Sequence, residues 1–109
     1  MGFLLVDADR NFREALAIAL RLEGHAVAAA ATAEDGRERI AAGGIRCCVV
    51  DALLTDADSV LAAAVAAGLR TVVTATYPDL LASAARRNPR AEMLLKPFAP
   101  VALLGRSAA

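Results

Sequence analysis

One stretch of the chain reads Cys47-Cys48-Val49-Val50-Asp51-Ala52-Leu53-Leu54-Thr55-Asp56-Ala57-Asp58-Ser59. Its four apolar residues end abruptly in a carboxylate, and a polar, turn-rich segment follows before a helical run over residues 60–67. A fully buried parallel strand has this pattern when it delivers an acid to the edge of a sheet. Asp51 is therefore the candidate reacting group.

Two other segments are built in the same way. Residues 3–6 are apolar and run into Asp7, and residues 70–73 run into Thr74. The carboxyl ends of the strands in an open parallel sheet line the ligand crevice. We therefore expect Asp7, Asp51 and Thr74 to converge.

Strand-like and helix-like segments alternate five times along the chain. The predicted strands cover residues 3–6, 25–30, 47–51, 70–75 and 91–95, and the predicted helices cover residues 10–23, 32–43, 58–67, 78–87 and a short segment from about 100. This alternation predicts an α/β fold whose parallel sheet is covered on both faces by right-handed crossovers. The length of 109 residues suits one domain, residues 1–109.

The last helix is predicted to be short, because only residues 101–104 separate Pro100 from Gly105. Two explanations are open. Either the segment is cut short in this chain, which we favour, or a partner subunit supplies the missing cover. Because a short helix would leave apolar sheet surface exposed, a homodimer is one prediction.

The composition argues against several classes of partner. Twelve basic and twelve acidic residues give a formal charge of zero, and no basic patch indicates nucleic acid or an anionic membrane. The longest apolar run, residues 60–69, is about half of the roughly 20 residues that a membrane span needs. The chain also starts without a targeting signal. We expect a cytoplasmic protein with neither nucleic-acid nor membrane partners.

Cys47 and Cys48 are neighbours on one predicted strand, so their side chains should point to opposite faces and not pair with each other. No metal-ligand spacing surrounds them, and His25 is the only histidine. The pattern favours two small buried side chains in a reducing compartment.

The polar residues at the predicted strand ends favour phosphate chemistry. The carboxylates of Asp7, Asp9 and Asp51 would repel one another unless a cation lay among them, and Mg²⁺ suits one or two carboxylates plus a phosphate oxygen. Asp51 would then attack phosphorus as a nucleophile and form an acyl phosphate. Thr74 offers a hydroxyl to the phosphoryl oxygens, and Lys96, the single lysine beside eleven arginines, offers an ammonium.

In this order the landmarks resemble the receiver domain of two-component response regulators. They are Val6-Asp7, Val49-Val50-Asp51, Val72-Val73-Thr74-Ala75 and Leu94-Leu95-Lys96-Pro97-Phe98, and the likeness covers residues 3–104. The resemblance implies a flavodoxin-like sheet of order 2-1-3-4-5. It also implies phosphorylation of Asp51 by a histidine kinase or phosphotransfer protein, with Thr74 as the switch hydroxyl and Lys96 as the phosphate-binding lysine. Asp7 and the backbone carbonyl of Leu53 match magnesium ligands of the family.

The chain departs from the family pattern after the first strand. The family usually has a second, adjacent acid that contacts the metal, and here that position is Ala8. Asp9 is one candidate substitute as a metal ligand, and an N-cap for the following helix is the alternative that we favour. Thr55 and Ser59 also stand where the family usually has Pro and Gly.

A further departure affects the switch. Met93 stands three residues before the lysine, where the family usually has an aromatic side chain that moves with the switch hydroxyl. Met93 is otherwise an adaptable apolar side chain in the core. Tyr77 is either a substitute for that aromatic residue or a partly exposed loop residue.

Two functions remain open at this point. The first is a phosphorelay receiver that accepts a phosphoryl group on Asp51 and switches an interaction face toward an unknown output protein. It would be no conventional enzyme, with at most Mg²⁺-dependent self-phosphorylation and autodephosphorylation. The second is a pseudo-receiver, an interaction module that no longer depends on phosphorylation. Retention of Thr74 and Lys96 favours the first, and Ala8 favours the second.

Overall fold

The computed structural model describes residues 2–107, which form five strands and five helices in strict alternation. The strands are β1 (Gly2–Val6), β2 (Ala26–Ala30), β3 (Ile45–Asp51), β4 (Arg70–Ala75) and β5 (Glu92–Leu95). The helices are α1 (Arg10–Leu22), α2 (Ala33–Ala42), α3 (Ala57–Ala66), α4 (Pro78–Arg87) and α5 (Val101–Ser107). Each predicted element is present, and α5 continues through Gly105 because one glycine weakens a helix without ending it.

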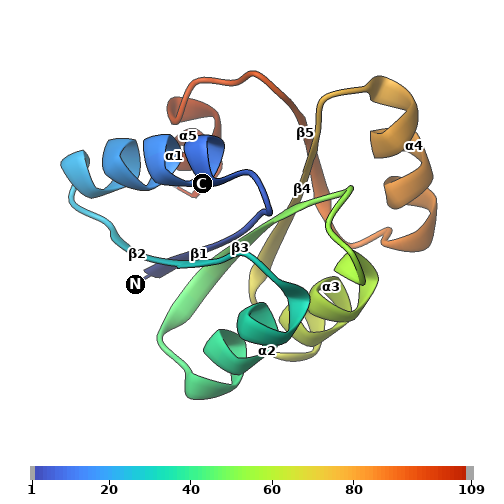
Figure 1. Ribbon diagram of the computed structural model, residues 1–109, viewed down its shortest axis with the longest axis horizontal. Helices are drawn as coiled ribbons and strands as arrows, with labels where there is room; N and C mark the ends of the chain where they lie inside the picture. Colours follow the sequence, from blue (N-terminus) through green and yellow to red (C-terminus); the bar gives the residue numbers. More distant parts are fainter. Residues whose placement is uncertain (1, 108–109) are drawn as a thin grey trace.

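The five strands form one parallel sheet in the order β2-β1-β3-β4-β5. Figure 1 shows α1 and α5 on one face of this sheet and α2, α3 and α4 on the other. The predicted flavodoxin-like fold is therefore confirmed. Because the chain leaves β1 toward β2 and then returns to β3, the order reverses between β1 and β3, and such a switch point opens a crevice at the carboxyl ends of the strands.

Local signals in the sequence begin and end the helices. The Asp9 carboxylate caps α1 by accepting a hydrogen bond from the Phe12 N–H at 3.1 Å, and the Thr32 hydroxyl caps α2 by accepting one from the Asp35 N–H at 3.2 Å. Gly24 follows α1 with a φ of +91°, which glycine adopts without strain. No helix within residues 2–107 is long and apolar enough to cross a membrane.

Two apolar layers pack against the sheet, one on each face. The layer on the α1 and α5 face contains Leu5, Leu16, Leu20, Cys47, Val49, Val72 and Leu103, and the opposite layer contains Leu4, Val6, Cys48, Val50, Val60, Leu61 and Val73. The two cysteines thus lie in different layers, both free and buried, as the alternation along a strand predicted. Burial on both faces explains why the strands are continuous apolar runs.

The short α5 is anchored by one arginine. The Arg70 guanidinium donates to both carboxylate oxygens of Glu92 at 2.8 and 3.1 Å, and it donates to the backbone oxygen of Leu103 at 2.7 Å. The Leu103 side chain is fully buried in the same layer as Val49 and Val72. The apolar surface of β3 and β4 that a short last helix was expected to leave exposed is therefore covered by Leu103. The homodimer stays a prediction, but this exposed surface no longer supports it.

Both thiols should be unreactive in the folded protein. Burial raises the pKa of Cys47 to about 11 and that of Cys48 to about 12, from an ordinary value of 9.0. Because the thiolate is the reacting species, we expect Ellman's reagent at about pH 8 to label neither cysteine until guanidinium unfolds the chain. As the pH rises, the thiols lose their protons at a lower pH in the unfolded chain than in the folded chain. Because this stabilises the unfolded chain, the free energy of unfolding should fall as the pH rises above about 9. Rapid labelling of the folded protein would contradict this prediction.

Candidate functional site

The carboxyl ends of four strands bring the predicted polar residues to one edge of the sheet. Asp7 follows β1 directly, and its N–H extends the pairing with β2 by donating to the Ala30 backbone oxygen at 3.1 Å. Asp51 ends β3 in register with Thr74 of β4. Lys96 follows β5, and its N–H donates to the Ala75 backbone oxygen at 2.8 Å. The sheet register therefore decides where each side chain enters the crevice.

The Lys96 ammonium joins the two carboxylates. Its Nζ lies 2.8 Å from Asp7 Oδ2 and 3.4 Å from Asp51 Oδ1. All three side chains are largely withdrawn from solvent, with exposed fractions of 14% for Lys96, 5% for Asp7 and 14% for Asp51. One positive charge among two negative charges leaves the cluster with an excess negative charge, which attracts a cation.

The environment of Asp51 favours its protonated form. Burial raises the pKa of its carboxyl group above the ordinary value, and the nearby charge of Asp7 raises this pKa further. The Lys96 ammonium and the Leu53 backbone N–H act in the opposite direction because both stabilise the carboxylate. Positive charge from Lys96 thus partly offsets the effect of burial and Asp7 on the pKa of Asp51.

The start of α1 positions Asp7. The Asp9 N–H donates to Asp7 Oδ1 at 2.9 Å, and Arg13 Nη1 donates to the Asp7 backbone oxygen at 2.8 Å. The Asp9 carboxylate is itself used as the α1 cap, in agreement with the alternative that we favoured, and its side chain lies at the surface. The sequence analysis did not identify Arg13, whose partner lies six residues away on the preceding loop.

The hydroxyl of Thr74 is buried without a hydrogen-bond partner. Thr74 is fully buried. Among the residues that the structure describes, its Oγ1 is the one buried side-chain oxygen or nitrogen atom that has no hydrogen-bond partner. Leaving such a group unpaired costs about 1–3 kcal/mol, so an unpaired hydroxyl requires an explanation. Its position beside Asp51 in the sheet register suits a hydroxyl that donates to an oxygen of a bound or attached group.

An aromatic ring lies against the ammonium. The Nζ atom of Lys96 lies 4.0 Å from the centroid of the Phe12 ring, and the Phe12 and Phe98 rings meet edge to face at 5.8 Å. The sequence analysis did not single out Phe12. No short-range signal identified its contact with Lys96, because the two residues are far apart in the sequence.

The loop after Asp51 is tied to α2. Arg37 Nη1 donates to Ser59 Oγ at 2.6 Å and to Asp56 Oδ2 at 3.2 Å, and Ser59 Oγ donates to the Asp56 backbone oxygen at 2.8 Å. Asp56 has a φ of +63°, in the left-handed region that Asp tolerates better than most residues. These contacts tie Asp56, at the end of the loop, and Ser59, in the first turn of α3, to α2.

Met93 and Tyr77 occupy different environments. Met93 is partly buried, packs against the apolar layer on the α2, α3 and α4 face, and pairs in register with Val73. Tyr77 precedes α4 and its side chain is 63% exposed. The positions agree with an apolar core residue and an exposed loop residue, respectively.

The donor chemistry of the crevice fits a hard divalent cation, with one carboxylate fewer than the family usually has. Asp7 and Asp51 supply two carboxylates with excess negative charge, and Mg²⁺ commonly takes one or two carboxylates, water and phosphate oxygens. The exposed residue Ala8 supplies no oxygen from its side chain. Among residues 2–107, no cluster of three or more Asp, Glu, His or Cys side chains is arranged to hold a metal ion.

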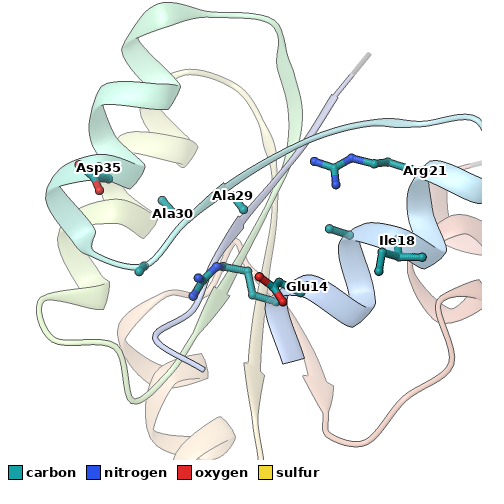
Figure 2. A pocket seen from close by; sticks show the side chains of 9 residues that line it. Glu14, Ile18, Arg21, Ala29, Ala30 and Asp35 are labelled. Carbon is teal, nitrogen blue, oxygen red and sulfur yellow. The ribbon is translucent and has the colours of Figure 1, made fainter. Parts of the chain in front are cut away.

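A surface pocket of about 460 Å³ adjoins the backbone of Asp7, because its lining residues Arg13 and Ala30 both form hydrogen bonds with that backbone. Figure 2 shows its lining, which comes from α1, the end of β2, the segment that leads into α2 and the first turn of α2. The lining residues are Arg13, Glu14, Ala17, Ile18, Arg21, Ala29, Ala30, Ala31 and Asp35. None of the predicted site residues is among them. We therefore assign the chemistry to the strand ends, where the charged groups converge, and not to this hollow.

No protein-family model and no curated protein sequence matches this chain. A CheY-like response regulator receiver domain from Methanospirillum hungatei JF-1 is 27% identical, with a TM-score of 0.82 over 97% of this chain and 89% of that chain. A signal receiver domain of an HD domain-containing protein from Pseudomonas fluorescens Pf-5 is 20% identical, with a TM-score of 0.83 over 98% and 90% of the two chains. A response regulator from Burkholderia pseudomallei, with a phosphorylated aspartic acid, a calcium ion and citrate, is 23% identical, with a TM-score of 0.82 over 95% of this chain and 64% of that chain.

These matches confirm the resemblance found in the sequence. The fold of this chain is the one found in CheY-like response regulator receiver domains. The chain differs from the usual pattern of these domains at Ala8, after the first acid of the site, and at Met93, three residues before the lysine.

Replacing Lys96 with methionine should destabilise the domain. The change leaves Asp7 and Asp51 close together without their cation, and removing one partner of a buried ion pair costs about 3–5 kcal/mol. We expect the free energy of unfolding in guanidinium to fall by about 3 kcal/mol. The matched control is Arg10→Met, which removes the exposed pair with Glu14 and should change the free energy of unfolding far less, because solvent screens exposed ion pairs. Equal effects of the two substitutions would contradict the prediction.

Proposed function

We propose that this domain acts in a phosphorelay and accepts a phosphoryl group on Asp51 from a histidine kinase or a phosphotransfer protein. One observation carries the proposal: Lys96 bridges Asp7 and Asp51 in the crevice, where Thr74 keeps a buried hydroxyl without a partner. The receiver-domain fold of the structural neighbours supports a role in response regulation, and one neighbour contains a phosphorylated aspartic acid.

Asp51 acts as the nucleophile in the proposed transfer. One of its carboxylate oxygens forms a bond to phosphorus, and the bond from phosphorus to the donor's imidazole nitrogen breaks, with its electron pair moving to that nitrogen. Thr74 donates its hydroxyl proton in a hydrogen bond to one phosphoryl oxygen, and Lys96 pairs with another. Water attack on the acyl phosphate later restores the carboxylate and releases inorganic phosphate.

Asp7, Asp51 and the backbone carbonyl of Leu53 are the groups that would hold Mg²⁺. When bound, the ion supplies positive charge that offsets the charge of the phosphoryl group. Other residues position these candidate ligands. The Asp9 N–H and Arg13 orient Asp7, and the Arg37 contacts hold the loop that carries Leu53.

The added charge provides the switch. A phosphoryl group on Asp51 brings strong acceptor oxygens and negative charge next to Lys96 and Thr74. Moving Lys96 toward these oxygens weakens its contact with Asp7, and moving Thr74 shifts the end of β4. We propose that these movements bias the α4, β5 and α5 face, which meets a partner protein that the sequence does not identify.

A pseudo-receiver is the second candidate function. The observation that favours it is that Lys96 already compensates Asp7 and Asp51 in part, so the site holds together with Ala8 in place of an acid. In this case the domain presents its surface to a partner without any chemical change at Asp51.

Mass measurement separates the two functions. The purified domain is incubated with acetyl phosphate, with and without Mg²⁺, alongside the variant Asp51→Asn. We expect the mass of the wild type to rise by one phosphoryl group only with Mg²⁺, and we expect no increase in the variant. A folded wild-type domain that gains no phosphoryl group under either condition would contradict the phosphoacceptor and favour the pseudo-receiver.

Replacing Ala8 with aspartate should strengthen Mg²⁺ binding. Because ligand charge sets the affinity of oxygen sites, we expect the half-saturating Mg²⁺ concentration in an NMR shift titration to fall on the order of tenfold. The companion variant Asp9→Asn keeps a good N-cap and should leave Mg²⁺ affinity unchanged if Asp9 only caps α1. Weaker binding by Asp9→Asn would instead identify Asp9 as a ligand, and unchanged binding by Ala8→Asp would show that the missing acid is not limiting.

A further inference from the structure

The Phe12 ring contacts the charged group on which the proposed chemistry depends. Lys96 Nζ lies over this ring, 4.0 Å from its centroid, while the same ammonium reaches Asp7 and Asp51. The ammonium therefore has two kinds of partner, carboxylate oxygens on one side and an aromatic face on another. Attraction between a cation and an aromatic face is strongest where the cation is desolvated, and the Lys96 side chain is only 14% exposed.

The ring is itself held in place from two directions. Its backbone N–H donates to the Asp9 carboxylate, which fixes Phe12 in the first turn of α1. On the side of the β5–α5 loop, Phe98 packs edge to face against it with a centroid distance of 5.8 Å. Both rings also belong to the apolar layer on the α1 and α5 face. Phe12 thus presents a pre-positioned surface to Lys96.

An aromatic face suits a lysine that must change partners. A lysine side chain has a flexible four-carbon stem, and an ammonium without directional support samples many positions. Another carboxylate at this place would hold the ammonium strongly and oppose its turn toward a phosphoryl group. The ring instead holds it through a weaker attraction that adds no charge to the site.

We propose that Phe12 is a positioning residue that holds the Lys96 ammonium at the point from which it engages the phosphoryl group on Asp51. The catalytic part of this inference rests on the proposed phosphoacceptor function, whereas the contact itself is independent of it. Phe12 touches no reacting atom and acts through Lys96. Its ring also links the site to the β5–α5 loop through Phe98.

The single lysine makes the contact directly measurable. Labelling the protein with ¹³C-lysine gives the side-chain signals of Lys96 alone, and protons over an aromatic face are shifted upfield by the ring current. We expect an upfield shift of the Lys96 Cε protons in the wild type and in Phe12→Tyr, which keeps the ring. The shift should disappear in Phe12→Leu, which keeps the apolar bulk. An unchanged shift in Phe12→Leu would overturn the proposal.

Phosphorylation kinetics test the role of the contact. With acetyl phosphate and Mg²⁺, we expect the saturating rate of Phe12→Leu to be about threefold to tenfold below that of the wild type and that of Phe12→Tyr to lie within about twofold. Thermal unfolding of both variants shows whether they are folded under the assay conditions. If folded Phe12→Leu and Phe12→Tyr react equally fast, Phe12 does not position Lys96 for the reaction.

The two proposals fail in different ways. If the wild type accepts no phosphoryl group, the phosphoacceptor function fails, and the kinetic role of Phe12 fails with it. The lysine shift then decides whether the ring still holds the ammonium in the unmodified domain. If the wild type is phosphorylated and the lysine shift does not depend on the ring, only the inference about Phe12 is overturned.

Discussion

The contact of one ammonium with two carboxylates is the interaction on which the crevice depends. Asp7 and Asp51 end neighbouring strands in the middle of the sheet, where burial and the nearby charge of Asp7 raise the pKa of the Asp51 carboxyl group. Lys96 partly offsets this effect from the end of β5, at the far edge of the sheet. The same contact therefore joins the ends of β1, β3 and β5 and leaves a negative charge that a divalent cation can offset.

The fold supports this contact by keeping the strand ends in register. Apolar layers on both faces leave the polar groups to emerge at the carboxyl ends of the strands, and the reversal between β1 and β3 opens the crevice there. Arg70 extends the support to the last elements, because it joins β4, β5 and the backbone of α5. The position of Lys96 thus depends on a sheet edge that is itself anchored.

The start of α1 is more than a connection between two elements. Asp9 caps the helix with its carboxylate and orients Asp7 with its N–H, Arg13 holds the Asp7 backbone oxygen, and Phe12 lies against Lys96. The first turn of α1, directly after Ala8, therefore caps the helix, orients Asp7 and contacts Lys96. The charges of the site are thus oriented by hydrogen bonds and by an aromatic face, and neither adds a further charge to the site.

The sequence by itself determined what depends on near neighbours. Apolar runs ending at Asp7, Asp51 and Thr74 predicted the strands and their polar ends, and the cap at Asp9 depends on a contact only three residues along the chain. Only the tertiary structure decided which distant groups meet. The partners of Lys96 lie 45 and 89 residues away, and the Arg70 contact with Leu103 spans 33 residues. The physical reason is that periodicity and capping act along the chain, whereas these contacts depend on strand register and helix packing, which no local pattern specifies.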